Sequence, residues 1–311
     1  MIDIVTTVYS GDYMSLILQA RSFEKHLDSD FVGKIFAVYN SDDYAVFARY
    51  FETKIKPQYG RFQNRVVLLQ SSDLLAGADL SKYPPWYIQM ANKLFISQHV
   101  GSPWFLALDC KNHFIRRASA ETLFAETKAV SFLQFNEKNL SNFYEGSFGF
   151  IGTELFEAGK VRMPAWTPYI MQTATTRTLL GEHFGGDAET FLSAAIERQL
   201  TEFYVYEAYV RKAQNVENLY SFGKPFVSTV WAKSTLSDKK FDRCIKRTTR
   251  THCLCFGVHR KSYLQMSQAQ WHAVVDLWET YELISGPEGL RLKATHASGS
   301  NLMTGLELLA G

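Results

Sequence analysis

The chain has 311 residues, of which 46% are hydrophobic and 21% are charged, and its formal net charge is +2. This composition is that of a folded globular protein with a sizeable core and excludes a disordered chain. The nearly balanced charge gives no bulk field that would attract nucleic acid, and we expect no nucleic-acid partner.

Targeting signals and cysteines indicate the compartment. No apolar run approaches the ~20 residues that span a bilayer. The N-terminus lacks the basic and apolar regions of a signal peptide. The four cysteines do not suggest a disulfide scaffold in a chain of this length. We therefore expect a cytoplasmic protein.

The first ~110 residues alternate between predicted strands and helices. Strands are expected at 2–9, 34–40, 65–70 and 104–109, with helices after the first two and at about 85–100. This order predicts an α/β fold with an open, mostly parallel sheet and helices on both faces. The ligand of such a sheet binds beyond the carboxyl ends of its strands. Asp12 and Asp109 follow two of these ends.

The second half of the chain is less regular and more helical. It contains predicted strands at 129–134, 146–152, 225–231 and 252–258, a mainly helical stretch at 168–212, and a capped helix at 267–281. From Gly286 onward the periodicity is lost, which predicts a poorly ordered tail over 286–311.

Four motifs together suggest a family: "IDIVTTVYSGD", "PPWYIQMANKL", "LALDCKNHF" and "LTEFYVYEAYV". In this order and at these separations they resemble bacterial glycosyltransferases of the GT-A type, and in particular a largely uncharacterised group associated with surface polysaccharides. The resemblance covers about residues 1–265. It implies a GT-A-like fold, with a nucleotide-sugar-binding half at 1–150 and an acceptor-side half at 151–285 that continues the same domain.

The resemblance also implies a function, namely transfer of a sugar from a nucleotide-sugar donor to a polysaccharide, oligosaccharide or lipid-linked glycan in capsule or lipopolysaccharide synthesis. Six side chains are then expected to bind the donor: Thr7, Tyr9, Asp12, Trp86, Gln89 and Lys93. Hydroxyl, aromatic and acidic groups suit a nucleotide, and a Trp-Gln-Lys stripe on one helix face suits its sugar and phosphates. The alternative is a strand end and a partly solvated helix face with no ligand.

The stretch "LDCKNHF" has a lysine where many nucleotide-sugar enzymes have the second acid of an Asp-x-Asp motif. Two carboxylates favour a bound cation, whereas Asp109 with Lys111 is already neutral, since one ion pair near a protein surface is worth about 4 kcal/mol before desolvation. We expect Lys111 to neutralise the donor phosphate as a catalytic group, and Asp109 to bind a donor hydroxyl or orient Lys111. An ordinary ion pair is the alternative.

Two histidines provide an alternative in which the site binds a metal ion. In metal-dependent relatives a late histidine completes the cation site, and His259 has a comparable place in "FGVHRK". Asp109, His113 and His259 are therefore the expected ligands if a divalent cation, Mn or Mg, is used. A metal-independent site is favoured, with His259 near the donor.

Glu202 lies in the last motif, close to the predicted start of a helix, and is the expected catalytic base or a ligand of the acceptor. A carboxylate takes the proton from the attacking hydroxyl in an inverting transferase, and the resemblance implies an acid at this helix start. The alternative is an acid favoured by the helix dipole. Asp187 is a second choice, but its position in "GGDAET" predicts an N-cap.

Two further features have plainer interpretations. Cys244, Cys253, Cys255 and His259 lack the usual spacing of a zinc site. The stretch "KKFDRCIKRTTR" is rich in basic residues and could meet anionic lipid or an acidic glycan, although a solvated face is its simpler explanation. Peripheral association with the inner membrane surface therefore stays open.

Two other classes of protein compete with a transferase. The missing second Asp is also consistent with a nucleotide- or glycan-binding protein whose catalytic site has decayed. A Rossmann-type oxidoreductase is disfavoured, since the first turn contains Ser-Gly-Asp and no Gly-x-Gly-x-x-Gly.

Overall fold

The computed structural model describes residues 1–135, 140–155 and 161–297. A five-stranded sheet with the order β10-β4-β1-β2-β3 forms its centre. Its strands are β1 (Ile2–Val8), β2 (Val32–Tyr39), β3 (Val66–Gln70), β4 (Trp104–Asp109) and β10 (Tyr169–Gln172). Neighbouring strands run parallel, except that β10 is antiparallel to β4. The mostly parallel sheet predicted from the sequence is confirmed.

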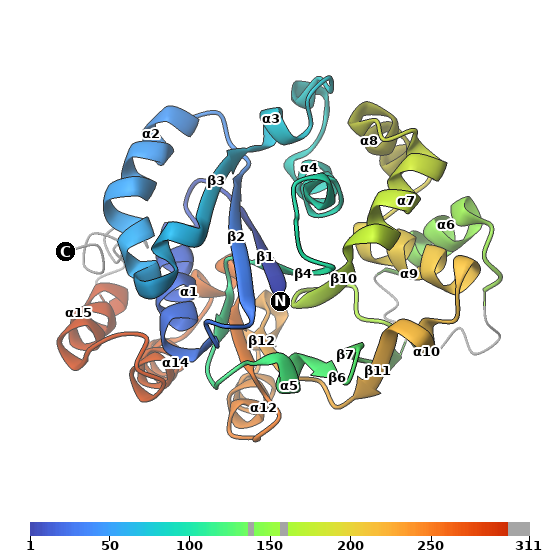
Figure 1. The fold of residues 1–311 in the computed structure, drawn as a ribbon. Coiled ribbons are helices and arrows are strands. Elements are labelled where there is room, and N and C mark those ends of the chain that lie inside the picture. Colours follow the sequence, from blue (N-terminus) through green and yellow to red (C-terminus); the bar gives the residue numbers. More distant parts are fainter. Residues whose placement is uncertain (136–139, 156–160, 298–311) are drawn as a thin grey trace.

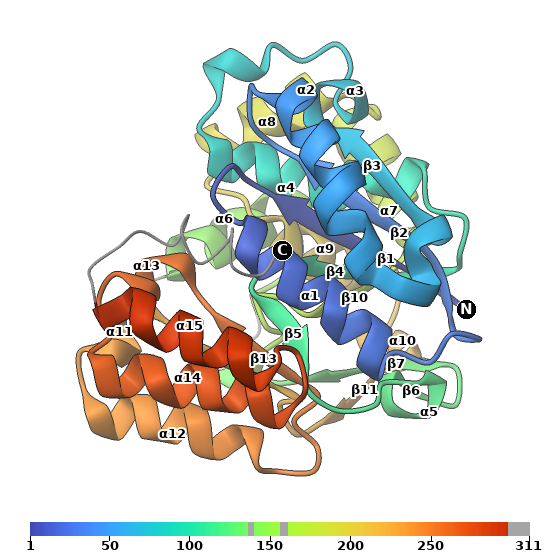
Figure 2. The same cartoon turned by 90° about the vertical axis from the view of Figure 1, so that its left-hand side faces the viewer.

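Helices cover both faces of this sheet, as the two views in Figures 1 and 2 show. One face carries α1 (Tyr13–His26), α2 (Tyr44–Tyr50) and the helical turns Phe51–Ile55 and Lys56–Arg65. The other carries α4 (Pro85–Phe95), α7 (Thr173–Phe184), α8 (Ala188–Glu197) and α9 (Glu202–Ala213). All residues of β1 are buried, as expected for a central strand covered on both sides.

Two three-stranded sheets extend the structure below the central sheet. One has the order β11-β7-β6 and the other β12-β13-β5. Their strands are β5 (Asn112–Phe114), β6 (Phe124–Ala125), β7 (Lys128–Phe132), β11 (Tyr220–Gly223), β12 (Val227–Val230) and β13 (Cys255–Val258). Because β13 pairs with β5, directly after Asp109, the late segment 258–261 reaches the carboxyl end of β4.

The C-terminal helices gather beside α1 (Figure 2). They are α11 (Ala232–Thr235), α12 (Asp238–Thr248), α13 (Arg260–Tyr263), α14 (Gln268–Thr280) and α15 (Gly286–Ala297). The remaining short elements are α3 (Ser71–Leu74), Leu80–Lys82, Ile96–Gln98, α5 (Ala120–Leu123), β8 (Gln134–Phe135), β9 (Val161–Arg162) and α10 (Val216–Leu219). Within the described ranges, no helix is long and apolar enough to cross a membrane.

The strand predicted at 146–152 is wrong. These residues belong to α6 (Ser141–Ile151), whose buried Tyr144, Phe148 and Ile151 recur at helical spacing. A Cβ atom at Gly146 would lie 2.0 Å from the carbonyl oxygen of Arg198. The glycine therefore allows close packing of the helix on the chain before α9, although glycine disfavours helices.

The C-terminal tail is also different from the prediction over its first part. Residues 286–297 form α15, in which Leu292 is fully buried and Glu288 pairs with Arg21 at 3.0 Å. Packing on α14 supplies the stability that the local pattern does not indicate. The rest of the predicted tail, 298–311, lies outside the described residues.

Candidate active site

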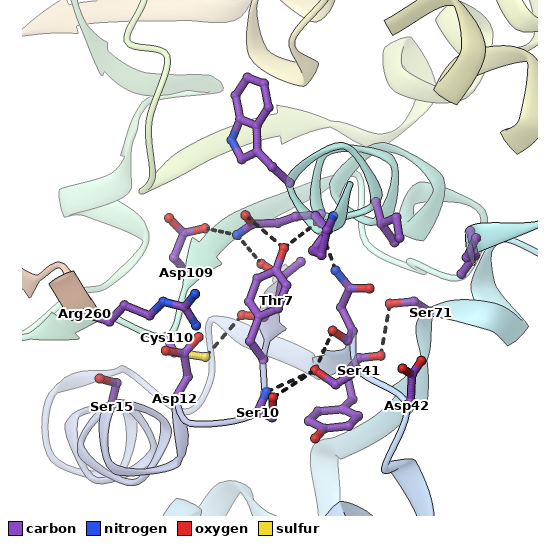
Figure 3. Close-up of a pocket in the computed structure, with 18 of the residues that line it drawn as sticks. Thr7, Ser10, Asp12, Ser15, Ser41, Asp42, Ser71, Asp109, Cys110 and Arg260 are labelled. Carbon is purple, nitrogen blue, oxygen red and sulfur yellow. Dashed lines mark hydrogen bonds between the residues drawn. The ribbon is translucent and has the colours of Figure 1, made fainter. Parts of the chain in front are cut away.

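A cavity of about 1120 Å³ opens at the carboxyl ends of β1, β2 and β4. Figure 3 shows it with part of its lining. The lining includes eight predicted site residues: Thr7, Tyr9, Asp12, Trp86, Gln89, Asp109, Lys111 and His259. Parallel strands bring their carboxyl ends to one edge, which is where ligands of this class of sheet bind. Its size suits a ligand as large as a nucleotide sugar.

Gln89 ties the predicted donor residues together. Its Nε2 donates to Thr7 Oγ1 at 2.9 Å and to Asp109 Oδ1 at 3.0 Å. The hydroxyl of Tyr9 donates to the carbonyl oxygen of Pro85 at 2.6 Å. These bonds fix the start of α4 against the ends of β1 and β4. The Trp86 ring, 44% exposed, lines the cavity one turn earlier on the helix.

Asp109 makes further polar contacts beyond Gln89. Lys93 Nζ lies 2.9 Å from its Oδ1, Thr167 Oγ1 donates to its Oδ2 at 3.0 Å, and Lys111 pairs with the same Oδ2. The backbone N–H of Asp109 donates to Asn112 Oδ1 at 3.0 Å. Burial alone would raise the pKa of this carboxyl, but the two lysines outweigh it and hold the pKa well below its usual range.

Lys93 is not the exposed helix residue that the stripe pattern predicted. It is 4% exposed and does not line the cavity. Its Nζ bridges Asp109 and Glu202 Oε1, the latter at 3.2 Å, and lies 5.1 Å from the Phe203 ring centre. Burial lowers the pKa of Lys93, but the two carboxylates reverse this effect and raise it. Lys93 is buried because α8 and α9 pack on this face of α4.

Glu202 lies behind Lys93, away from the cavity. It is 5% exposed and starts α9, where Thr201 is the N-cap. Burial raises the pKa of its carboxyl, while Lys93 lowers it. Its carboxylate accepts a hydrogen bond from Lys93 Nζ. The structure therefore brings Glu202 together with Asp109 through a lysine, and Glu202 is not among the residues that line the cavity.

Lys111 lies on the cavity side of the same carboxylate. Its Nζ is 5.3 Å from the ring centre of Trp231, a side chain that is 37% exposed. His259 also faces this indole, with 5.4 Å between the ring centres. Burial, followed by Lys111, lowers the pKa of His259 to about 4. Lysine and neutral histidine thus lie on one edge of the cavity, and the Trp231 indole packs against both.

The predicted cation ligands do not fit a divalent ion. The His113 Nε2 atom faces the Ser15 carbonyl oxygen at 3.2 Å, and its ring packs on Trp278. The Nδ1 atom of His259 accepts from the N–H of Lys261, and both oxygens of Asp109 are held by lysines. In the described part of the chain, no three His, Cys, Asp or Glu side chains are grouped to hold a metal.

Arg260 is a cavity residue that the sequence analysis missed. Its side chain extends toward Asp12 (Figure 3), and its guanidinium lies 6.0 Å from the Tyr9 ring centre. Burial raises the pKa of Asp12 to about 6, although Arg260 lowers it. The signal was available in "FGVHRK", where a basic residue follows the histidine, but only the pairing of β13 with β5 brings it here.

The end of β2 supplies further polar groups that were missed. Ser41 Oγ accepts from the N–H of Ser10 at 3.2 Å, and Asn40 Nδ2 donates to the Pro85 carbonyl oxygen at 3.1 Å. Asp42 lines the cavity beside them and is exposed. The Ser and Asp residues of "NSDD" are typical of a helix cap, and nothing local distinguishes a cap from a cavity wall.

Asp187, the second choice for a catalytic acid, is an N-cap as its position predicted. Its carboxylate accepts from the N–H of Thr190 at 2.7 Å, at the start of α8. This residue is not among those that line the cavity.

Most of the chain matches one protein family. Residues 2–243 match the family of unknown function DUF6492. The chain belongs to this family. A comparison with curated proteins finds no significant match. The matched residues include the central sheet and the cavity edge formed by α4 and β4. The family is of unknown function, so membership does not assign an activity.

Solved structures relate this DUF6492 protein to a known fold. The galactosyltransferase LgtC, solved with donor and acceptor sugar analogues, aligns with a TM-score of 0.53 at 13% identity, covering 94% of this chain and 100% of that one. The glycosyltransferase GlyE of Streptococcus pneumoniae aligns at 0.46 and 12% identity, covering 96% of this chain and 64% of that one, which is too distant to bear on the fold. The match to LgtC confirms the GT-A-like fold.

Proposed function

We propose that this protein is a glycosyltransferase that takes a sugar from a nucleotide-sugar donor and neutralises the leaving phosphates with Lys111 and Arg260 in place of a divalent cation. The observation that carries the proposal is the Asp109–Lys111 pair at the carboxyl end of β4, on the edge of a cavity in a GT-A-like sheet.

The cavity divides into two chemical regions. Hydroxyl and amide groups from the ends of β1 and β2 suit ribose and base, since they offer both donors and acceptors. Lys111 and Arg260, two of the cationic residues that line the cavity, suit the diphosphate. A donor bound across the cavity would then place its nucleotide at the end of β1 and its sugar near Asp109, as we predicted from the sequence.

The chemical role of Lys111 follows from where charge develops. As the acceptor oxygen bonds to the sugar carbon, the bond between that carbon and the phosphate oxygen breaks, and the leaving nucleoside diphosphate gains negative charge and takes up the proton of the acceptor hydroxyl. A fixed ammonium stabilises this state more than the ground state, which accelerates the step. Packing against Trp231 and pairing with Asp109 hold the ammonium in place before the donor arrives. No step here requires a metal ion.

Lys93 and Glu202 are positioning residues in this proposal. Neither residue lines the cavity. The buried ion pairs from Glu202 through Lys93 to Asp109 fix the carboxylate that orients Lys111. Glu202 could take the proton from an acceptor hydroxyl only if its contact with Lys93 were broken.

The acceptor proposed here is a saccharide in surface-polysaccharide synthesis, free or attached to lipid. The exposed ring of Trp231 beside Lys111 provides an apolar surface next to the reacting end of the cavity, and sugar rings stack on such surfaces. A lipid-linked acceptor would place the protein at the cytoplasmic face of the membrane.

A nucleotide panel tests the proposal. We expect one of UDP, GDP, ADP or CDP to raise the melting temperature in excess chelator, and the matching nucleotide sugar to be hydrolysed slowly. Lys111→Met should lose both effects. Binding without any turnover across acceptors would favour the decayed binding protein, and no stabilisation by any nucleotide would contradict both.

A further inference from the structure

The surface around α12 combines a basic face with exposed leucines. Five basic residues of this helix are exposed: Lys239, Lys240, Arg243, Lys246 and Arg247. At 3.6 residues per turn they fall within an arc of roughly 120°. The opposite side of the helix is buried through Phe241, Cys244 and Thr248. The helix is therefore anchored by its apolar face and presents its cations outward.

These cations are not neutralised by ion pairs in the part of the chain that the structure describes. None of the five forms an ion pair with a described carboxylate. Of the two acids in the helix, Asp238 accepts from Gln270 Nε2 at 2.9 Å, and Asp242 is exposed at the edge of the basic arc. A folded domain with a net charge of only +2 thus concentrates positive charge on one helix.

Two leucines project from the turns beside the start of this helix. Leu236 is 74% exposed and Leu264 is 80% exposed, which places them among the most exposed large apolar residues described. Their turns are joined, because Thr235 Oγ1 donates to Gln265 Oε1 at 3.5 Å. Exposed leucines weaken solubility and gain nothing from water, so a basic face alone does not account for them.

We propose that α12, Leu236 and Leu264 form a docking surface for an anionic lipid bilayer. The basic face suits the negative headgroups, and the leucines suit the acyl boundary just beneath them, which is how peripheral proteins combine charge with apolar insertion. An acidic glycan would use the cations but would leave both leucines in water. The combination therefore favours lipid.

The surface also lies close to the cavity. Leu264 follows α13, and the first residue of that four-residue helix is Arg260, which lines the cavity. Figure 2 shows α11, α12 and α13 together at one corner of the molecule. Docking through this corner would hold the cavity edge near the headgroups, within reach of a lipid-linked substrate. The docking itself does not depend on the proposed transferase activity.

Co-sedimentation with vesicles tests the charge contribution. The full-length protein should sediment with vesicles that contain phosphatidylglycerol, but not with phosphatidylcholine alone, and high salt should release it. Lys239→Glu, Arg243→Glu and Lys246→Glu combined should weaken binding by at least about tenfold. The matched control combines Lys34→Glu, Arg198→Glu and Lys224→Glu, which change net charge equally at exposed sites on other elements. An equal loss in the control would reduce the effect to bulk charge and overturn the proposal.

A leucine pair tests insertion and separates lipid from glycan. Leu236→Ser with Leu264→Ser should weaken vesicle binding by about three- to tenfold, whereas Leu155→Ser with Leu290→Ser, also exposed, should not. Wild-type protein that ignores anionic vesicles, or that binds an acidic polysaccharide with no contribution from the leucines, would contradict a lipid surface. The melting temperature and the far-ultraviolet circular dichroism spectrum of all four variants should match those of the wild type, which shows that each is folded.

Discussion

Asp109 has a buried side and a cavity side, and each side has its own lysine. Lys93 is almost fully enclosed and shares its charge with Glu202, whereas Lys111 lies at the cavity edge against an exposed indole. The same ion pair chemistry thus serves two purposes. The buried lysine holds the fold around the carboxylate, and the outer lysine remains available to a ligand.

The largest expected effect is on the buried side. Lys93→Ala leaves Asp109 without one partner and Glu202 without a countercharge in a closed interior, and breaking such a buried pair costs about 3–5 kcal/mol. Urea unfolding should show this loss in the free energy of unfolding, or the variant should fail to fold. Lys111→Ala, its counterpart across the carboxylate, should lose about 1 kcal/mol or less. Similar losses for the two lysines would remove the distinction.

Asp12 tests whether a charged group on the cavity side lowers the free energy of unfolding. Its pKa of about 6 lies above the usual carboxyl value, so the unfolded chain releases this proton at lower pH than the folded one. Its ionisation therefore costs stability increasingly from pH ~4 to pH ~6, fully above that range, and not at all below it. Each pKa unit is worth about 1.4 kcal/mol, and partial exposure reduces the total.

Asp12→Asn should accordingly stabilise the protein by about 2 kcal/mol at pH 8 and leave stability unchanged near pH 3.5. Thermal or urea unfolding at the two pH values measures this. A variant that is destabilised at pH 8 would mean that Asp12 is a structural acid and not one held ready for a ligand.

Lys111→Ala should weaken binding of the preferred nucleoside diphosphate by about tenfold or more, since it removes a charge beside the phosphates. Isothermal titration calorimetry gives the affinity. Lys82→Ala is the matched control, because Lys82 is an exposed lysine near the other end of the cavity and pairs with Asp79 at 3.4 Å. Equal effects of the two substitutions would assign the loss to general charge.

Glu202→Gln should have the smallest effect. The amide keeps the shape and can still accept from Lys93, which retains Asp109 as a partner. We expect a loss of about 1 kcal/mol in stability and nucleotide affinity within twofold of wild type. If transfer collapses while folding and nucleotide binding persist, Glu202 is the catalytic base that the sequence suggested.

The central sheet and most of the cavity lining could be predicted from the sequence. Alternating strands and helices predicted the parallel sheet, and strand ends then located Thr7, Asp12 and Asp109 at one edge. Lys93 was misplaced because helical spacing shows which residues share a face, not what packs on it. Arg260 was missed because the pairing of β13 with β5 joins residues more than a hundred positions apart.

The central claim is that this cavity holds a diphosphate without a divalent cation. The most direct measurement is the affinity of the preferred nucleoside diphosphate in excess chelator and in excess manganese or magnesium. The account predicts the same affinity within about twofold in each buffer, a loss in Lys111→Ala in each of them, and partial metal dependence in Lys111→Asp. Binding that disappears in chelator and returns with manganese in the wild-type protein would contradict it.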